Sequence, residues 1–371
     1  MAFRFNFSNP DSDADDSEHD DVQTSFEAIS LDATDQHRIV AKKFDIQAMT
    51  LPETLQADRI EMPNIAYGMY RRTLADVKFQ MAKQDTLDAN QTPMIDMAED
   101  TDLIKGIYEG GFKTWECSLD LVEFMHSMDD AAFANKKILE LGCGSALPGI
   151  YLLMRIDTTR VDFQDYNDQV LQYITIPNII LNTVVAPTSA DEVQVEDAAA
   201  EVDDTTEQED EGYDDEEDDE DEDVPDQEPT DVDTADAELE ISEGQAGPML
   251  EKIVQRTQCY LGEWKTLPEA MSLTDNADRY DMIVTSETVY SEESIPGLVN
   301  ALQNTLKKPD GIAYVAGKTI YFGVGGGILP FCNAIDGAKD EAGHKLKHES
   351  VFETSGENTV KREILKITWD I

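Results

Sequence analysis

The sequence predicts an α/β fold in which a mainly parallel sheet carries helices on both faces. Between residues 104 and 371, short apolar segments typical of strands alternate with segments of helical periodicity. A glycine turn, Gly142-Cys143-Gly144, joins the first of these strands to a helix. Two β segments near the C-terminal end, 350–354 and 363–369, are expected to pair as an antiparallel hairpin at the sheet edge.

Two segments precede this domain. Residues 1–36 are polar and acidic, which predicts a disordered tail. Residues 37–103 are mixed in character and predict an N-terminal extension packed on the main domain. Within the extension, residues 67–82 have helical spacing, and Arg71 and Arg72 are expected to lie on its solvated face.

The first half of the main domain, residues 104–185, contains two signals for a ligand. Glycines at the turn after the first strand let the backbone approach a ligand closely. Asp165 ends the second strand, 21 positions beyond Gly144. An acid at this place accepts hydrogen bonds from ribose hydroxyls, so the two signals together predict a nucleotide-like crevice.

Residues 186–248 interrupt the domain with an acidic insertion. Between Asp191 and Glu243 there are 29 Asp or Glu residues and no Lys or Arg. Such a segment cannot build a core, so the sequence predicts a disordered loop. It is either a tolerated solvated insertion or a surface that attracts a basic protein.

The second half of the domain, residues 249–371, supplies three further strands, at 258–264, 282–287 and 312–316, and helices at 295–307 and 328–335. The strand ends are polar where they meet the crevice. The glycine run at 323–327 lacks the following Lys and Ser or Thr of a P-loop. It is either a flexible turn or a loop that completes the crevice.

Composition excludes several classes of function. The net charge of −51 disfavours direct binding to nucleic acid and favours a basic protein partner. The four cysteines are scattered, so neither a disulfide framework nor a metal site is expected. No segment has the pattern of a signal peptide or a membrane span, and a monomer inside the cell is expected.

Seven segments carry a more specific resemblance. In chain order they are Lys113–Ser118 (Lys-Thr-Trp-Glu-Cys-Ser), Glu140–Gly149 (Glu-Leu-Gly-Cys-Gly-Ser-Ala-Leu-Pro-Gly), Phe163–Asn167 (Phe-Gln-Asp-Tyr-Asn), Pro177-Asn178 with Asn182, Gly262–Trp264 (Gly-Glu-Trp), Thr285–Tyr290 (Thr-Ser-Glu-Thr-Val-Tyr) and Tyr321–Gly327 (Tyr-Phe-Gly-Val-Gly-Gly-Gly). Together they resemble the eukaryotic protein-histidine methyltransferases that modify a large-subunit ribosomal protein. Leu147 stands where a nicotinamide-binding turn has its third glycine, which disfavours a dehydrogenase.

The resemblance implies a Rossmann-like, seven-stranded sheet and S-adenosyl-L-methionine as cofactor. It also implies the residues that line the cofactor site, which are Thr114, Trp115, Glu116, Cys117, Ser118, Gly142, Gly144, Gln164, Asp165, Tyr166, Gly262, Glu263, Trp264 and Ser286. Without the resemblance, the residue pattern by itself also predicts Gly142, Gly144 and Asp165 as cofactor-site residues. Trp264 is expected to flank the adenine.

The implied reaction is methylation of a histidine side chain on a basic ribosomal protein, in the cytoplasm and nucleus. Imidazole is largely neutral near pH 7, so it needs only a group that fixes its tautomer and takes a proton late. Glu116, Asn182 and Glu287 are the candidates, without a ranking. Two alternatives stay open, a lysine methyltransferase of the same class and a non-catalytic acidic chaperone for basic proteins.

Overall fold

The computed structural model describes residues 39–62, 64–65, 68–85, 110–185, 188–189, 235–354 and 360–371. The tail predicted at 1–36 and residues 190–234 of the predicted insertion lie outside these ranges. The description that follows concerns the unit formed by residues 38–371.

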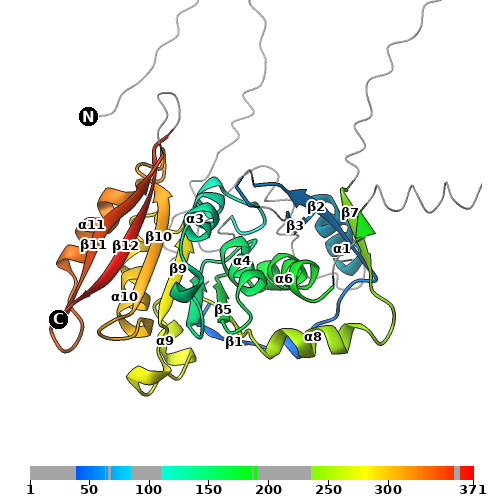
Figure 1. The fold of residues 1–371 in the computed structure, drawn as a ribbon, viewed down its shortest axis with the longest axis horizontal. Coiled ribbons are helices and arrows are strands. Elements are labelled where there is room, and N and C mark those ends of the chain that lie inside the picture. The colour runs from blue at the N-terminus through cyan, green and yellow to red at the C-terminus, as the bar shows by residue number, and fades with distance from the viewer. Residues whose placement is uncertain are drawn as a thin grey trace, which may run out of the picture. The chain divides into compact units, whose positions relative to one another are not determined.

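The main sheet contains eight strands among the described residues (Figure 1). From one edge to the other they are β1 (Lys42–Phe44), β8 (Cys259–Leu261), β5 (Arg160–Asp165), β4 (Lys137–Leu141), β9 (Met282–Ser286), β10 (Ile312–Lys318), β12 (Arg362–Asp370) and β11 (Lys345–Glu353). The strands from β8 to β10 are parallel, and β12 is antiparallel to β10 and β11. The predicted mainly parallel sheet and its C-terminal hairpin are therefore confirmed.

The strand count differs from the predicted seven because β1 adds an edge strand. β1 belongs to the N-terminal extension and pairs antiparallel with β8, with Lys43 opposite Tyr260. Its sequence, Lys-Lys-Phe, has neither the length nor the apolar alternation that predicts a strand. Backbone pairing with β8 makes it a strand, and that pairing joins segments far apart in the sequence.

Helices cover both faces of the main sheet. On one face lie α3 (Glu116–His126), α4 (Leu147–Arg155), α6 (Ile176–Thr183) and α8 (Ala246–Val254), and on the other α9 (Leu267–Ala270), α10 (Ile295–Thr305) and α11 (Ile328–Gly337). Successive side chains of a strand point to opposite faces. In β4, Ile138 accordingly joins the apolar cluster with α3 and α4, whereas Leu139 and Leu141 join the cluster with α10 and α11.

Short helical segments complete this unit. They are η1 (Ile46–Ala48), η2 (Asp130–Ala132), α5 (Asp168–Val170), the π-helical η3 (Leu171–Thr175) and η4 (Asn276–Asp278). None of the helices formed by the described residues combines the length and apolar character that crossing a lipid bilayer requires.

A second, antiparallel sheet combines the extension with both ends of the acidic insertion. Its order is β3 (Met69–Arg72), β2 (Thr54–Ile60), β7 (Ala237–Glu240) and β6 (Thr188–Ser189). β7 lies inside the segment 186–248 that the sequence analysis assigned wholly to a disordered loop. Ala237 and Leu239 are buried between exposed glutamates, and Leu239 pairs with Leu55 of β2. The high acid content of the segment predicted a loop, so this half-buried strand was not predicted.

The extension is held to the main domain by Arg72. This residue was expected on a solvated helix face, but it ends β3, is only 2% exposed, and precedes α1 (Leu74–Asp85). Its Nε donates to Asp76 Oδ2 at 2.7 Å and its Nη1 to the carbonyl of Tyr173 at 3.0 Å. Its backbone N–H donates to Asn178 Oδ1 of α6 at 2.8 Å. The guanidinium is therefore buried but largely compensated.

Replacing Arg72 with Ala should destabilise the protein far more than replacing its neighbour Arg71. Removal of one partner of a buried pair leaves the Asp76 carboxylate without its cation, so Arg72→Ala should lower the free energy of unfolding by about 3 kcal/mol. Arg71 is partly exposed and pairs with Asp58 at 3.0 Å, so Arg71→Ala should cost below about 1 kcal/mol. Equilibrium urea unfolding of both variants measures the difference. Equal losses of unfolding free energy in the two variants would contradict the conclusion that Arg72 holds the extension to the main domain.

Candidate functional site

The predicted site segments meet at the carboxyl edge of the parallel strands. Because β4, β5, β8, β9 and β10 run in one direction, their carboxyl ends open on the same side of the sheet. The strand ends at this edge include Asp165 and Lys318, and the turns that follow the strands contain Gly142 to Gly144, Gly262 to Trp264 and Glu287. The structure thus brings together segments that are more than 170 residues apart in the chain.

Gln164 joins two of these turns, the glycine turn after β4 and the Gly262 turn after β8. Its Oε1 accepts hydrogen bonds from the backbone N–H of Gly142 at 3.2 Å and from Trp264 Nε1 at 2.7 Å. Its Nε2 donates to the carbonyl of Gly262 at 2.8 Å. The side chain is buried, so these bonds satisfy an amide that would otherwise be costly to bury. Gln164 therefore fixes the glycine turn, the Gly262 turn and the indole ring relative to one another.

Asp165 holds the second glycine of the turn. Its Oδ2 accepts from the N–H of Gly144 at 2.9 Å, and its Oδ1 accepts from the N–H of Asn167 at 3.2 Å. Gly142 has a φ of +60°, and a Cβ there would lie 2.6 Å from Thr288 Cγ2. The turn therefore requires glycine at position 142.

Glu140 lies beneath the glycine turn and is fully buried. Its Oε2 accepts from the N–H of Gly149 at 2.8 Å, at the start of α4. Burial raises the pKa of Glu140 from 4.5 to about 8, and the nearby Asp165 carboxylate adds to the rise. From the other side, Thr175 of η3 donates to the carbonyl of Gly144 at 2.7 Å. The turn is thus held both from below and from the π-helical segment.

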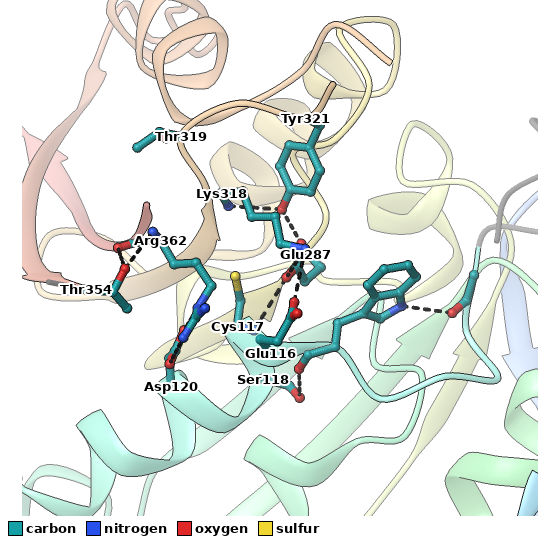
Figure 2. A network of polar contacts seen from close by, with 12 residues as sticks. Glu116, Cys117, Ser118, Asp120, Glu287, Lys318, Thr319, Tyr321, Thr354 and Arg362 are labelled. Atoms are coloured by element: carbon teal, nitrogen blue, oxygen red, sulfur yellow. Dashed lines mark hydrogen bonds and ion pairs between the residues drawn. The ribbon is translucent and has the colours of Figure 1, made fainter. Parts of the chain in front are cut away.

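Glu287 forms the centre of a second cluster (Figure 2). It follows β9 with a φ of +55°, a conformation that non-glycine residues rarely adopt and that is concentrated at functional sites. Oε1 accepts from the N–H of Cys117 at 3.4 Å and lies 3.9 Å from Lys318 Nζ. Oε2 accepts a hydrogen bond from the hydroxyl of Tyr321. The buried carboxylate is therefore fixed from three directions.

Glu116 and Lys318 form an ion pair beside this carboxylate. Lys318 Nζ lies 3.0 Å from Glu116 Oε2, and its hydrogen bond lowers the pKa of Glu116. Burial alone would lower the pKa of Lys318, but Glu116 and Glu287 raise it overall. Lys318 and Tyr321 were absent from the predicted site. The position of Lys318 at the end of β10, on the same sheet edge, is the signal that could have identified it.

The segment before α3 contributes the buried Thr114 hydroxyl to this edge of the sheet. Thr114 Oγ1 is buried without a hydrogen bond among the described residues. Trp115 Nε1 donates to the carbonyl of Gly110 at 3.1 Å, and the Ser118 hydroxyl donates to the carbonyl of Trp115 at 2.7 Å. The Cys117 thiol is buried, and burial raises its pKa, so it is a packed thiol and not a reactive one.

Three predicted residues lie on the same edge with half-buried side chains. Tyr166 follows β5, Glu263 follows Gly262, and Ser286 is the last residue of β9. The backbone of Glu263 also donates to the carbonyl of Ile39 at 2.8 Å, which ties the edge to the start of the extension.

Asn182 is not brought to the site. It lies in α6, where its Oδ1 accepts from the N–H of Tyr70 at 2.8 Å and its Nδ2 donates to the carbonyls of Tyr70 and Asn178 at 2.8 and 2.7 Å. Its amide is therefore committed to the backbone of β3 and cannot act on a substrate at the carboxyl edge. The predicted catalytic role of Asn182 is corrected to an anchor of the extension.

Comparison with known proteins identifies several relatives. The histidine protein methyltransferase 1 of Schizosaccharomyces pombe is 30% identical over 297 residues, which cover 78% of this chain and 75% of that protein. The Saccharomyces cerevisiae protein of the same name is 27% identical over 99% of this chain and 98% of its own length. The Bos taurus homologue is 31% identical, but the match covers 62% of this chain and only 49% of the bovine protein.

Other comparisons are weaker. No family model matches the chain. Among solved structures, the O-methyltransferase TomG from Streptomyces achromogenes is 11% identical with a TM-score of 0.38, over 79% of this chain and 95% of that one. The assignment to a family therefore rests on the sequence relatives.

The buried Glu140 should make stability depend on pH. The unfolded carboxyl ionises near 4.5 and the folded one near 8, so between these values only the unfolded state loses its proton. Stability of the wild type therefore falls as pH rises through this window, by up to about 1.4 kcal/mol per pH unit from this group. Glu140→Gln has no such proton to lose, so its free energy of unfolding should increase relative to wild type from pH 5 to pH 8.

Urea unfolding at several pH values within this window measures that difference. Glu251→Gln, on the exposed face of α8, is the matched control and should follow the wild type throughout. A constant difference between Glu140→Gln and wild type would contradict a raised pKa at Glu140.

Proposed function

Because the chain belongs to the histidine protein methyltransferase 1 family, we propose that it methylates a histidine side chain of a basic protein, with S-adenosyl-L-methionine as methyl donor. The observation that carries the proposal is the convergence of the glycine turn, Asp165, Trp264 and the Glu287 cluster on one sheet edge. The proposed client is a large-subunit ribosomal protein, and methylation would take place in the cytoplasm or nucleus. The net charge of −51 supports a basic client through electrostatic steering.

The residues around the glycine turn fit the proposed cofactor. Asp165 ends β5 beside the glycine turn, the place where an acid accepts hydrogen bonds from ribose hydroxyls. The buried Thr114 hydroxyl has no partner among the described residues. Trp264 lies beside the glycine turn, since a Cβ at Gly142 would meet its ring at 3.6 Å. The ring is half-buried and offers an apolar face to a base. When bound, the cofactor supplies an electrophilic methyl group carried on a sulfonium.

Glu287 is the residue we propose to orient the histidine. As an acceptor-only group when ionised, it can take a hydrogen bond from one imidazole N–H and so present the other nitrogen, unprotonated, as nucleophile. It can also accept the proton that the methylated ring releases. Glu116 is less suited, because its carboxylate is mostly exposed and paired with Lys318. The fixed, buried position of Glu287 supplies the alignment on which such a transfer depends.

Asp165 should be required for cofactor affinity. Loss of a charge-assisted hydrogen bond typically costs about 1.5–3 kcal/mol, so Asp165→Ala should weaken binding of S-adenosylmethionine by roughly tenfold or more. Isothermal calorimetry measures this. Asp165→Asn preserves the shape of the turn and should also bind more weakly, whereas the exposed Asp168→Ala should bind like wild type. Wild-type affinity in both Asp165 variants would refute the proposed cofactor site.

Glu287→Gln should slow the reaction without weakening cofactor binding. Removal of a positioned acid–base group typically lowers a rate by about 10²–10⁴-fold, so kcat for methylation of the protein client should fall by about 10²-fold. Glu353→Gln, which alters an exposed carboxylate paired with Lys361, is the control and should leave kcat unchanged. A wild-type kcat for Glu287→Gln would exclude the proposed role.

The choice of substrate residue is tested with a client in which the target histidine is replaced by Ala. We expect radiolabelled methyl transfer from S-adenosylmethionine to disappear with that substitution. Undiminished labelling that is lost when lysines of the client are replaced would support the lysine alternative, because a lysine ammonium needs prior deprotonation and a different set of residues.

A further inference from the structure

An exposed apolar patch lies on the glycine-rich loop between β10 and α11. Eight large hydrophobic side chains are exposed in the part of the chain that the structure describes, and half of them belong to this loop and the first turn of α11. They are Ile320, Phe322, Val324 and Leu329, here called the apolar loop patch, and Phe322 is 78% exposed. Isolated exposed hydrophobic residues are ordinary, but a group of this kind marks an interaction surface.

The backbone that carries the patch is fixed by close contacts. Gly326 donates to the carbonyl of Tyr290 at 2.9 Å, and Gly327 donates to that of Val289 at 2.8 Å. A Cβ at Gly326 would lie 2.2 Å from the backbone of Tyr290, so only glycine allows this approach. The N–H of Tyr321 donates to the carbonyl of Gly326 at 3.2 Å. These contacts place the glycine run directly against the backbone of the segment that follows Glu287.

The same loop reaches the proposed catalytic centre. Tyr321, between two members of the patch, donates its hydroxyl to Glu287, as Figure 2 shows. That hydroxyl also accepts from the N–H of Lys318 at 3.1 Å. Two members of the apolar loop patch, Ile320 and Phe322, are therefore the chain neighbours of a residue that contacts Glu287.

Negative charge borders the patch. Residues 287–293 contain three glutamates, Glu287, Glu292 and Glu293, and the loop 318–329 contains a single cation, Lys318, which is paired with Glu116. A Cβ at Gly325 would lie 3.9 Å from the carboxyl carbon of Glu292, so the carboxylates stand directly beside the loop. Nucleic acid, anionic lipid and the acidic insertion of this chain would be repelled. A basic partner with an apolar side chain is complementary.

We infer that the apolar loop patch docks the client, which presents a basic segment with an aliphatic or aromatic side chain within about three residues of the target histidine. This inference rests on the proposed function and adds a sequence requirement to it. Burial of one apolar side chain on the patch supplies affinity, and the neighbouring glutamates attract the flanking cations. The short path from Phe322 through Tyr321 to Glu287 sets the spacing between docked side chain and histidine.

Two fluorescein-labelled peptides test the inference by anisotropy. Each carries one histidine flanked by lysines, and they differ only in having Leu or Ser two residues from the histidine. Wild type should bind the Leu peptide about tenfold more tightly, the effect of burying one aliphatic side chain. Phe322→Ser with Val324→Ser should remove this preference. The control Phe79→Ser, which alters a residue of α1 that is 71% exposed, should keep it.

The outcomes separate the inference from the proposed function. Equal affinity of wild type for both peptides, or an unchanged Leu preference in the double variant, overturns the docking inference, whatever the methylation result. A Leu preference lost only in the Phe322 and Val324 variant supports it. If this holds while wild type methylates no histidine client, docking stands and the proposed function fails.

Discussion

The buried amide of Gln164 is the interaction on which the functional edge depends. Two turns that follow different strands donate to it or accept from it, through three hydrogen bonds of the side chain. An amide buried without partners costs about 1–3 kcal/mol per unsatisfied group, so the turns are coupled by that cost. The parallel strands deliver the turns to one edge, and Gln164 then sets their mutual positions. The glycine turn and the Trp264 ring thereby belong to one unit.

The residues around the glycine turn and the residues around Glu287 are joined through the end of β9. Thr285 donates to the carbonyl of Leu141 at 2.7 Å and shares a 2.7 Å hydrogen bond with Thr288, whose methyl group fills the space that a side chain at Gly142 would need. Between these two threonines the backbone turns through the left-handed conformation of Glu287. Packing against the glycine turn thus holds Glu287 in its left-handed conformation. The residues that follow β9 therefore line both the proposed methyl donor site and the proposed acceptor site.

Local sequence patterns were sufficient for the parallel sheet, because its buried strands are short apolar runs with polar ends. They were insufficient wherever a distant partner decides the structure. β1 is a strand only because β8 pairs with it, and the Leu55–Leu239 pair places β7 in a segment that composition alone marks as acidic loop. The Arg72 guanidinium is buried against Asp76 and the carbonyl of Tyr173, and the Asn182 amide bonds to the backbone of Tyr70. Charge and polarity alone had predicted a solvated face for the first and catalysis for the second. The Tyr321–Glu287 contact joins residues 34 apart and has no local signature.

The second sheet explains why the chain tolerates a long acidic insertion. β6 and β7 pair with Ser189 opposite Ala237, so the two ends of the insertion are held side by side. Bringing together the two ends of a chain segment costs entropy that rises with the logarithm of its length, by about 0.6 kcal/mol for each doubling. Once the ends are fixed, added residues therefore cost little. Because β2 of the N-terminal extension completes that sheet, the extension stabilises the ends of the insertion. The carboxylates of the insertion agree in sign with the proposed encounter with a basic client.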